Sequence, residues 1–209
     1  MGLMDCYIFN TIMKWNDRKM SDNMKTVSGN TGISGKAAKS ALFALIGGAA
    51  ALILDQVTKY MAVEHLMSQP PFEIISGVFE LRYLENRGAA FGMMQNRQYL
   101  FVVGAFIVMV ILIYLYHRMP YTKRYTPLRF CAVLLWAGAA GNAIDRLRLG
   151  YVIDFFYFKL IDFPIFNVAD CYVVVACFLF AFLILFYYRE DDDFDFLSRK
   201  KKEGKIKES

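Results

Sequence analysis

The sequence has few of the residues on which metal or disulfide chemistry depends. It contains only two histidines, His65 and His117, and no HExxH motif, which argues against zinc-dependent hydrolysis. Its four cysteines show no spacing typical of a metal site or a disulfide framework. Cys131 and Cys177 lie inside apolar runs, where a packed thiol is the expected state. Any chemistry is therefore expected from other residue types.

A basic face interleaved with aromatic residues, typical of nucleic-acid-binding surfaces, is also missing. The net charge is +5, but the basic residues gather at the two chain ends and in one short loop. We interpret this charge as a determinant of membrane topology and expect no nucleic-acid partner. Residues 1–40 contain no apolar core of a secretory signal. Their polar, mixed composition predicts a disordered cytoplasmic extension.

Apolar residues, in contrast, are abundant: 57% of the 209 residues are hydrophobic, and the mean hydropathy is +0.34. This composition is typical of a small polytopic membrane protein with one domain, here predicted to cover residues 41–188. A charged cytoplasmic tail, residues 189–209, is expected to be solvated and partly disordered. Four segments are long and apolar enough to span a bilayer, namely Ala41–Val63, Tyr99–Tyr116, Phe130–Ile144 and a segment from about Asn167 to Tyr188.

The distribution of lysine and arginine predicts how these spans are oriented. Six of the 24 precede the first span, four lie in the turn His117–Arg129, and seven follow Tyr188, which leaves seven on the other side. The positive-inside rule therefore places both termini in the cytoplasm. Residues near Gln69 and Lys159 are then expected on the extracytoplasmic side.

The connection between the first two predicted spans has structure of its own. Phe72–Leu84 shows partial period-two alternation around Ser76-Gly77, which predicts a short hairpin lying on the membrane surface. The following segment, Asn86–Gly92, reads Asn-Arg-Gly-Ala-Ala-Phe-Gly. Its small residues permit close backbone approach, and Asn86 offers both hydrogen-bond donors and acceptors.

Polar residues at the ends of the spans are candidates for function, because burying an ionisable group near hydrocarbon costs about 3 kcal/mol or more. The ends of spans one and three and the start of span four reach the same membrane face. The topology therefore predicts that their polar groups converge on one site. These groups are Asp55 and Lys59 in the first span, Asn142, Asp145 and Arg146 in the third, and Asn167 and Asp170 in the fourth.

Asp154 and Asp170 are the pair most suited to catalysis. They lie 16 positions apart, and the intervening Phe155–Phe166 segment can fold back along the membrane surface to bring them together. Two carboxyl groups in a weakly hydrated place do not both ionise easily, so the pair holds a shared proton. Such a pair can hydrolyse a peptide bond without a metal ion.

Other interpretations stay open on the residues alone. Asp170 can be the acidic residue of a capping box that Asn167 begins, and Asp154 can be a solvated loop carboxylate. Asp145–Arg146 can form an interfacial ion pair. The charged residues of the first and third spans would also suit an ion path in a small transporter, and a structural membrane adaptor is a third class. A serine–lysine hydrolase is not favoured, since Ser68 and Ser76 are loop residues.

Five short motifs occur in one order between the four predicted spans and together cover about Ala41 to Tyr188. They are Asp55-Gln-Val-Thr-Lys59, Asn86-Arg-Gly-Ala-Ala-Phe-Gly92, Gly141-Asn-Ala-Ile-Asp-Arg146, Val152-Ile-Asp-Phe155 and Phe166-Asn-Val-Ala-Asp170. The set resembles lipoprotein signal peptidase (signal peptidase II), the bacterial membrane aspartyl peptidase. The N-terminal extension and the charged tail fall outside this resemblance.

The resemblance implies an all-α membrane protein: four transmembrane helices with a small extracytoplasmic β cradle and a short periplasmic-type helix near Asn86–Gly92. The family's catalytic aspartates fall on Asp154 and Asp170. Residues that would bind or orient the substrate and the aspartates are Asp55, Lys59, Asn86, Gly88, Phe91, Asn142, Arg146 and Asn167.

The resemblance also implies a reaction and a location. The expected reaction removes the signal peptide of a diacylglyceryl-modified prolipoprotein, just before the lipidated cysteine, at the extracytoplasmic face of the bacterial cell membrane. The expected partners are this substrate and membrane lipid. Neither a metal, an organic cofactor nor an obligate protein partner is implied.

Overall fold

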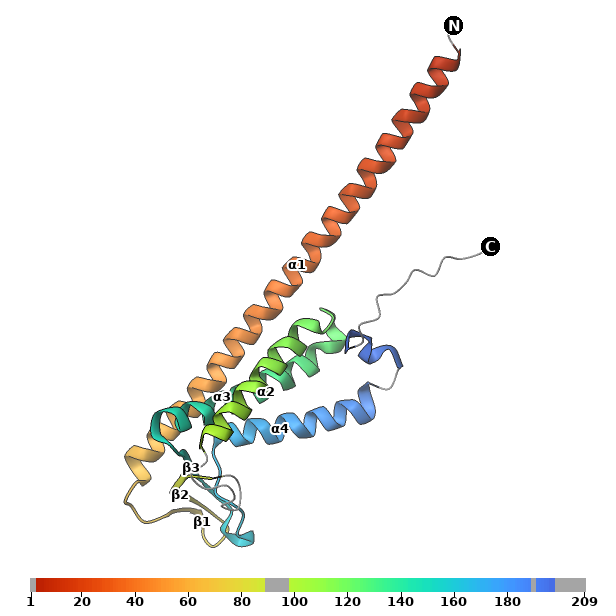
Figure 1. The fold of residues 1–209 in the computed structure, drawn as a ribbon. Coiled ribbons are helices and arrows are strands. Elements are labelled where there is room, and N and C mark those ends of the chain that lie inside the picture. Colours follow the sequence, from red (N-terminus) through yellow and green to blue (C-terminus); the bar gives the residue numbers. More distant parts are fainter. Residues whose placement is uncertain (1–2, 89–97, 189–190, 198–209) are drawn as a thin grey trace. The chain divides into compact units, whose positions relative to one another are not determined.

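Helices and one small sheet form the described parts of the chain (Figure 1). The computed structural model describes residues 3–88, 98–188 and 191–197, with side chains over 35–88, 98–188 and 194–197. The helices are α1 (Leu3–Leu66), α2 (Gln98–Arg118), α3 (Thr126–Leu149) and α4 (Val168–Phe182). The strands are β1 (Phe72–Ile75), β2 (Phe79–Asn86) and β3 (Val152–Tyr157). Short helical turns are η2 (Lys123–Tyr125), η3 (Lys159–Ile161), η4 (Leu183–Tyr187) and η5 (Asp191–Leu197).

Within the described residues, four helical segments are long and apolar enough to cross a membrane. They are Gly35–Leu66, Gln98–Arg118, Lys123–Leu149 and Val168–Tyr187. Each contains or closely matches one of the predicted spans. The prediction of a helical membrane protein with four transmembrane helices is confirmed.

The N-terminal part of α1 differs from the expectation. Leu3–Ser40 belong to the helix, whereas the sequence predicted disorder over residues 1–40. Helical hydrogen bonds are local, and this stretch contains no proline, so it can be helical without a tertiary partner. The chain divides into two compact units, Met1–Phe43 and Ala44–Ser209, close to the boundary predicted after residue 40.

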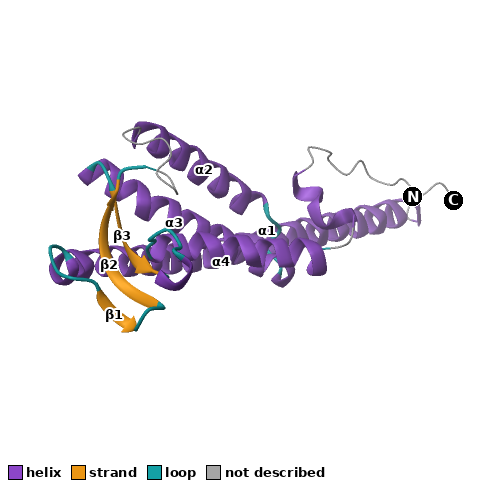
Figure 2. Cartoon of the chain, turned by 90° about the horizontal axis from the view of Figure 1, so that it is seen from below, coloured by secondary structure: helices purple, strands orange, loops and turns teal. Residues whose placement is uncertain are grey.

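The predicted hairpin is present as β1 and β2, joined by a turn in which Gly77 has φ +70° (Figure 2). Only glycine adopts this conformation without a steric penalty. The sequence did not predict β3, which adds to β2 in antiparallel fashion and completes the order β1-β2-β3. After β3 the chain turns through η3 and returns, so that Phe166 bridges to Phe156. This is the fold-back predicted for the Phe155–Phe166 segment.

Small residues let α3 and α4 approach closely. A Cβ atom on Gly138 would lie 2.6 Å from the carbonyl oxygen of Ala169 and 2.8 Å from a methyl group of Val173. A Cβ atom on Gly141 would meet the carboxylate of Asp55. This close packing at Gly138 and Gly141 brings the start of α4 against both α3 and α1.

At the end of the helices away from the sheet, the C-terminal segment packs against the spans. Phe194 and Phe196 contact a buried cluster that includes Tyr125 and Tyr188. Arg118 at the end of α2 donates to the carbonyl oxygen of Phe196 at 2.7 Å. The prediction of a solvated tail therefore does not hold at Phe194 and Phe196, whereas Asp195 and Leu197 are exposed. The high charge of the tail suggested full solvation, but burying the rings of its two phenylalanines away from water is favourable.

We expect Gly138→Ala to destabilise the protein by about 1–3 kcal/mol, because the new methyl group overlaps a backbone atom that cannot move independently. Unfolding in detergent followed by circular dichroism measures the change. Gly104→Ala on α2 is the matched control, since a Cβ there meets nothing within 4 Å. Equal stability of the two variants would contradict the close packing of α3 on α4.

Candidate active site

The sheet places the first of the two aspartates. In the register of β2 and β3, Leu84 pairs with Asp154 and Asn86 pairs with Val152. Asn86 and Asp154 are therefore diagonal neighbours on one face of the sheet. The Asn86 Nδ2 atom donates to Asp154 Oδ2 at 2.8 Å. Asp154, at 1% exposure, is not the solvated loop carboxylate of the alternative interpretation.

The second aspartate is held by the start of α4. Asn167 is the N-cap of this helix, and its Oδ1 atom accepts from the backbone N–H of Asp170 at 3.0 Å. In return the backbone N–H of Asn167 donates to Asp170 Oδ2 at 3.1 Å. This is the capping box considered from the sequence. It fixes the Asp170 carboxylate against the first turn of its own helix.

Asn167 also joins the two aspartates. Its Nδ2 atom donates to Asp154 Oδ1 at 2.7 Å, while its backbone and Oδ1 atom hold Asp170. Asn142 on α3 completes the arrangement, because its Nδ2 atom donates to Asp170 Oδ1 at 2.8 Å. Each of the four carboxyl oxygens therefore accepts at least one hydrogen bond. Asp154 and Asp170 come together as the sequence predicted.

Behind this pair lies a buried ion cluster centred on Lys59. Its ammonium group is 3.0 Å from Asp55, 2.9 Å from Asp145 and 3.0 Å from Asn142 Oδ1. The side chains of Lys59 and Asp55 are 2% and 0% exposed. Asp55 and Lys59 therefore form an i,i+4 ion pair within α1. Asp145 pairs with Lys59 on another helix, rather than with its sequence neighbour Arg146.

Two backbone N–H groups and the side chain of Gln56 complete the hydrogen bonds of this cluster. The N–H of Ala169, in the first turn of α4, donates to Asp55 Oδ1 at 2.9 Å. Asp145 accepts from the N–H of Ile153 at 3.3 Å and from Gln56 Nε2 at 3.1 Å. Gln56 was not among the site residues predicted from the sequence, although a polar residue next to Asp55 in an apolar helix indicates such a contact. The cluster thus ties α1 and α3 to the starts of β3 and α4.

A third set of contacts involves Arg146 and Gly88. Arg146 Nη2 donates to the carbonyl oxygen of Gly88, and Nη1 donates to that of Asn142, both at 3.3 Å. The N–H of Gly88 donates to Asn86 Oδ1 at 3.0 Å, so Gly88 connects Arg146 to the asparagine that binds Asp154. Phe91, the remaining predicted site residue, lies outside the described residues, as does the rest of the segment in which the short periplasmic-type helix was expected.

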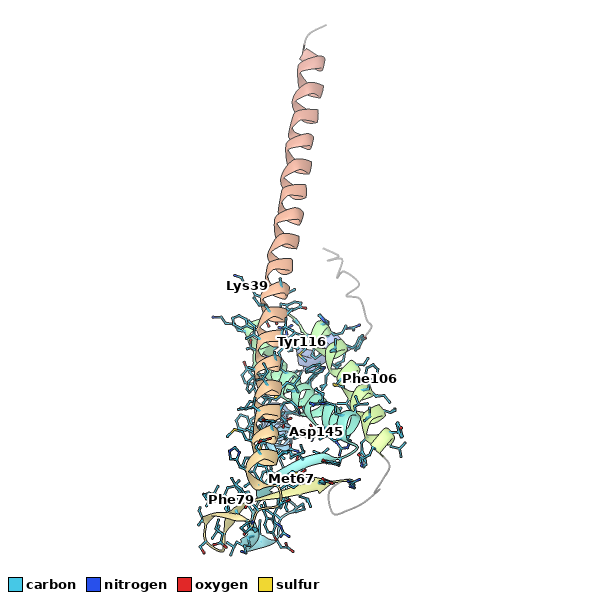
Figure 3. The ribbon with its side chains drawn as sticks, turned by 90° about the vertical axis from the view of Figure 1, so that its left-hand side faces the viewer. Lys39, Met67, Phe79, Phe106, Tyr116 and Asp145 are labelled. Atoms are coloured by element: carbon cyan, nitrogen blue, oxygen red, sulfur yellow. The ribbon has the colours of Figure 1, made fainter. Side chains whose placement is uncertain are left out.

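Both aspartates line one open cleft of about 1240 Å³. Its polar side is formed by the site residues on β2, β3 and α3. Its other side is apolar and comes from the returning segment after β3 and from α4. Figure 3 marks Asp145 between the sheet, which carries Phe79, and the far end of α2, which carries Tyr116. The apolar wall consists of Ile161, Phe163, Pro164, Ile165, Phe166, Cys171, Val174 and Val175.

The environment of Asp154 favours its protonated form. Burial raises the pKa of Asp154 to about 7, and the nearby charge of Asp170 acts in the same direction. Hydrogen bonds from Asn86 and Asn167 and the charge of Lys59 oppose this shift. At neutral pH the pair can therefore hold one proton between two carboxyl groups, the state required for combined acid and base catalysis.

Comparison with known families gives an independent result. The model of the family described as signal peptidase (SPase) II matches residues 45–186. The lipoprotein signal peptidase of Caldanaerobacter subterraneus subsp. tengcongensis is 43% identical over 136 residues, which are 65% of this chain and 90% of that protein. The lipoprotein signal peptidase of Streptococcus thermophilus is 40% identical over 152 residues, 73% of this chain and 92% of the relative.

Comparison with solved structures agrees with the family match. Two bacterial membrane enzyme structures, obtained by the in meso method, are similar to this chain at 30% sequence identity. One has a TM-score of 0.59 and covers 80% of this chain and 95% of its own length. The other has a TM-score of 0.58 and covers 72% and 94%.

We expect Lys59→Met to destabilise the protein by about 3–5 kcal/mol, because it leaves Asp55 and Asp145 buried without their common cation. Unfolding in detergent measures the loss. Lys39→Met is the matched control, since Lys39 lies exposed on the same helix. A Lys59→Met protein as stable as the control would show that the buried ion cluster does not hold the helices together.

Proposed function

Because the chain belongs to the signal peptidase II family, we propose that Asp154 and Asp170 are the catalytic pair of an aspartic endopeptidase. The chain is a membrane peptidase that removes the signal peptide from prolipoproteins. The proposal adds the catalytic type and the residues that perform the reaction. It is supported by the site itself, in which the two candidate carboxyl groups face one cleft.

The observation that carries the proposal is the bridge through Asn167. One side chain amide contacts Asp154 and also caps the helix that carries Asp170, so both carboxyl groups are fixed relative to each other. Lys59 bonds directly to neither of them; it is already bound by Asp55, Asp145 and Asn142. A carboxyl pair without a directly bound cation retains a shared proton more easily than a neutralised pair.

In the proposed reaction the ionised carboxylate accepts a proton from a water molecule as the water oxygen attacks the peptide carbonyl carbon. The protonated carboxyl group donates its proton to the carbonyl oxygen, which yields a neutral tetrahedral diol. Collapse of this intermediate breaks the C–N bond: the carboxyl group that took the proton from water passes it to the leaving nitrogen, and a hydroxyl proton of the diol returns to the other carboxylate. We assign the protonated role to Asp154, whose pKa of about 7 is raised by burial.

The other polar residues would orient the substrate and the pair. Asn86 and Asn142 hold the two carboxyl groups by one hydrogen bond each, and Arg146 lines the same cleft. The apolar wall of the cleft suits a substrate that bears acyl chains. We propose that this substrate is a diacylglyceryl-modified prolipoprotein and that cleavage occurs just before its lipidated cysteine.

We also propose that the site faces the extracytoplasmic side of a bacterial cell membrane, with both chain ends in the cytoplasm. The asymmetry of lysine and arginine between the two sides supports this orientation. The membrane domain would cover residues 41–188, between an N-terminal extension and a charged C-terminal tail. Membrane lipid and the prolipoprotein are the partners that this arrangement requires.

We expect Asp154→Asn and Asp170→Asn each to lower the cleavage rate by about 10²–10⁴-fold, because an amide can neither accept nor donate the required proton. The measurement is cleavage of a purified diacylated prolipoprotein, with the detergent unfolding midpoint as a check on folding. Asp162→Asn is the matched control, since Asp162 is an exposed aspartate at the rim of the same cleft. Full cleavage by either variant of the pair would refute the assignment.

The pH dependence follows from the raised pKa of Asp154. Below about pH 7 its carboxyl group keeps the proton, and above that pH the proton is lost and the general acid disappears. We therefore expect the cleavage rate to fall by roughly tenfold per pH unit well above pH 7. The profile is measured between pH 5 and about 9 at saturating substrate, with unfolding monitored at each pH. A rate that rises steadily through this range would contradict the assigned protonation state.

A further inference from the structure

Helix α2 carries no charged residue before its last turn, yet its first turn reaches the site. The ring of Phe101 lies under the guanidinium group of Arg146, with 4.8 Å between Cζ and the ring centroid. About one helical turn earlier, Gln98 Nε2 donates to the carbonyl oxygen of Arg87 at 2.6 Å. Among the described residues of α2, these two contacts link its start to the cleft.

Apart from its contact with this ring, the guanidinium group of Arg146 is held only weakly. Its two described hydrogen bonds, to the carbonyl oxygens of Asn142 and Gly88, are both 3.3 Å long. Its Nε atom is buried and has no partner among the described residues. An arginine side chain has about 2 kcal/mol of rotamer entropy to lose, and two long hydrogen bonds limit it poorly. An aromatic face fixes the plane of the guanidinium group, which aliphatic carbon does not do.

We propose that Phe101 is a positioning residue of the peptidase, which acts by holding Arg146 in its place at the cleft. The inference rests on the proposed function of this site. A continuous set of contacts leads from the ring to the catalytic pair. Arg146 binds the carbonyl oxygen of Gly88, the N–H of Gly88 binds Asn86, and Asn86 binds Asp154. A displaced guanidinium group releases the first of these contacts.

This role gives α2 a part in the site, although the side chains that hydrogen-bond to the two aspartates lie on α3, α4 and the sheet. No described residue of α2 is fully buried, and the α2 residues that pack against the buried cluster, Leu112, Leu115 and Tyr116, lie toward its other end. At the end near the site, α2 places the face of the Phe101 ring against Arg146. The charge of Arg146 in turn interacts with the charges of both aspartates. The cation and the ring are 45 positions apart in the sequence.

The experiment compares the variants Phe101→Leu, Phe101→Tyr and Phe106→Leu in cleavage of the diacylated prolipoprotein. We expect Phe101→Leu to lower kcat/KM by about tenfold, the range of a desolvated cation–π contact, with an unchanged unfolding midpoint. Phe101→Tyr keeps the ring and should retain activity within about twofold. Phe106 lies on the same helix, is 63% exposed and is the matched control for the loss of an aromatic ring (Figure 3).

A double-mutant cycle tests whether Phe101 acts through Arg146. Lysine keeps the charge of Arg146 but has no planar face, so Phe101→Leu should cost less than about twofold in an Arg146→Lys background. Single-turnover assays with excess enzyme keep the low rates measurable. Additive losses, or equal activity of Phe101→Leu and Phe106→Leu, would overturn the inference. The proposed function would still stand if the variants of Asp154 and Asp170 were inactive, so the two failures are distinguishable.

Discussion

The site depends on one side chain amide, that of Asn167. Its oxygen caps α4 and its nitrogen binds Asp154, so a single residue with no exposed surface relates the helix to the sheet. A buried amide that lacks its partners is costly, and each partner here is itself a buried or partly buried polar group. The geometry is therefore over-determined. Moving Asp154 relative to Asp170 breaks a hydrogen bond on one side of Asn167 or the cap of a transmembrane helix on the other.

The structure separates two kinds of carboxylate that lie close together. Asp55 and Asp145 share the ammonium group of Lys59 and accept from backbone N–H groups, so they form a closed ionic unit. Asp154 and Asp170 accept only from amides and backbone, and no described cation bonds to them directly. Asn142 stands at the boundary, because its oxygen accepts from Lys59 and its nitrogen donates to Asp170. The first unit links the helices, and the second is the pair to which we assign the shared proton.

Much of this arrangement was predictable from the sequence, because membrane topology restricts where polar residues can meet. The four spans, the hairpin at Ser76-Gly77 and the meeting of Asp154 with Asp170 follow from apolar length, turn chemistry and residues that are costly to bury. The ion-pair partner of Asp145 could not be predicted from the sequence, since Lys59 is 86 positions away and Arg146 is adjacent. Strand β3 was missed because its apolar, aromatic run reads equally well as a loop at the membrane surface. Cation–π pairs such as Arg146 with Phe101 have no sequence signature of their own.

The structural and catalytic interpretations of Asp170 were alternatives on the sequence, but in the structure the capping box is compatible with the catalytic role that we propose. The capping box binds one carboxyl oxygen of Asp170 to the N–H of Asn167, and the other oxygen accepts from Asn142. Both contacts stabilise the ionised form, as does the positive end of the helix dipole at this position. Asp154 does not lie at a helix terminus, and it is more deeply buried than Asp170. The same cap that begins α4 therefore makes the two carboxyl groups unequal, and inequality is what a pair needs if one member is to hold the proton while the other accepts one.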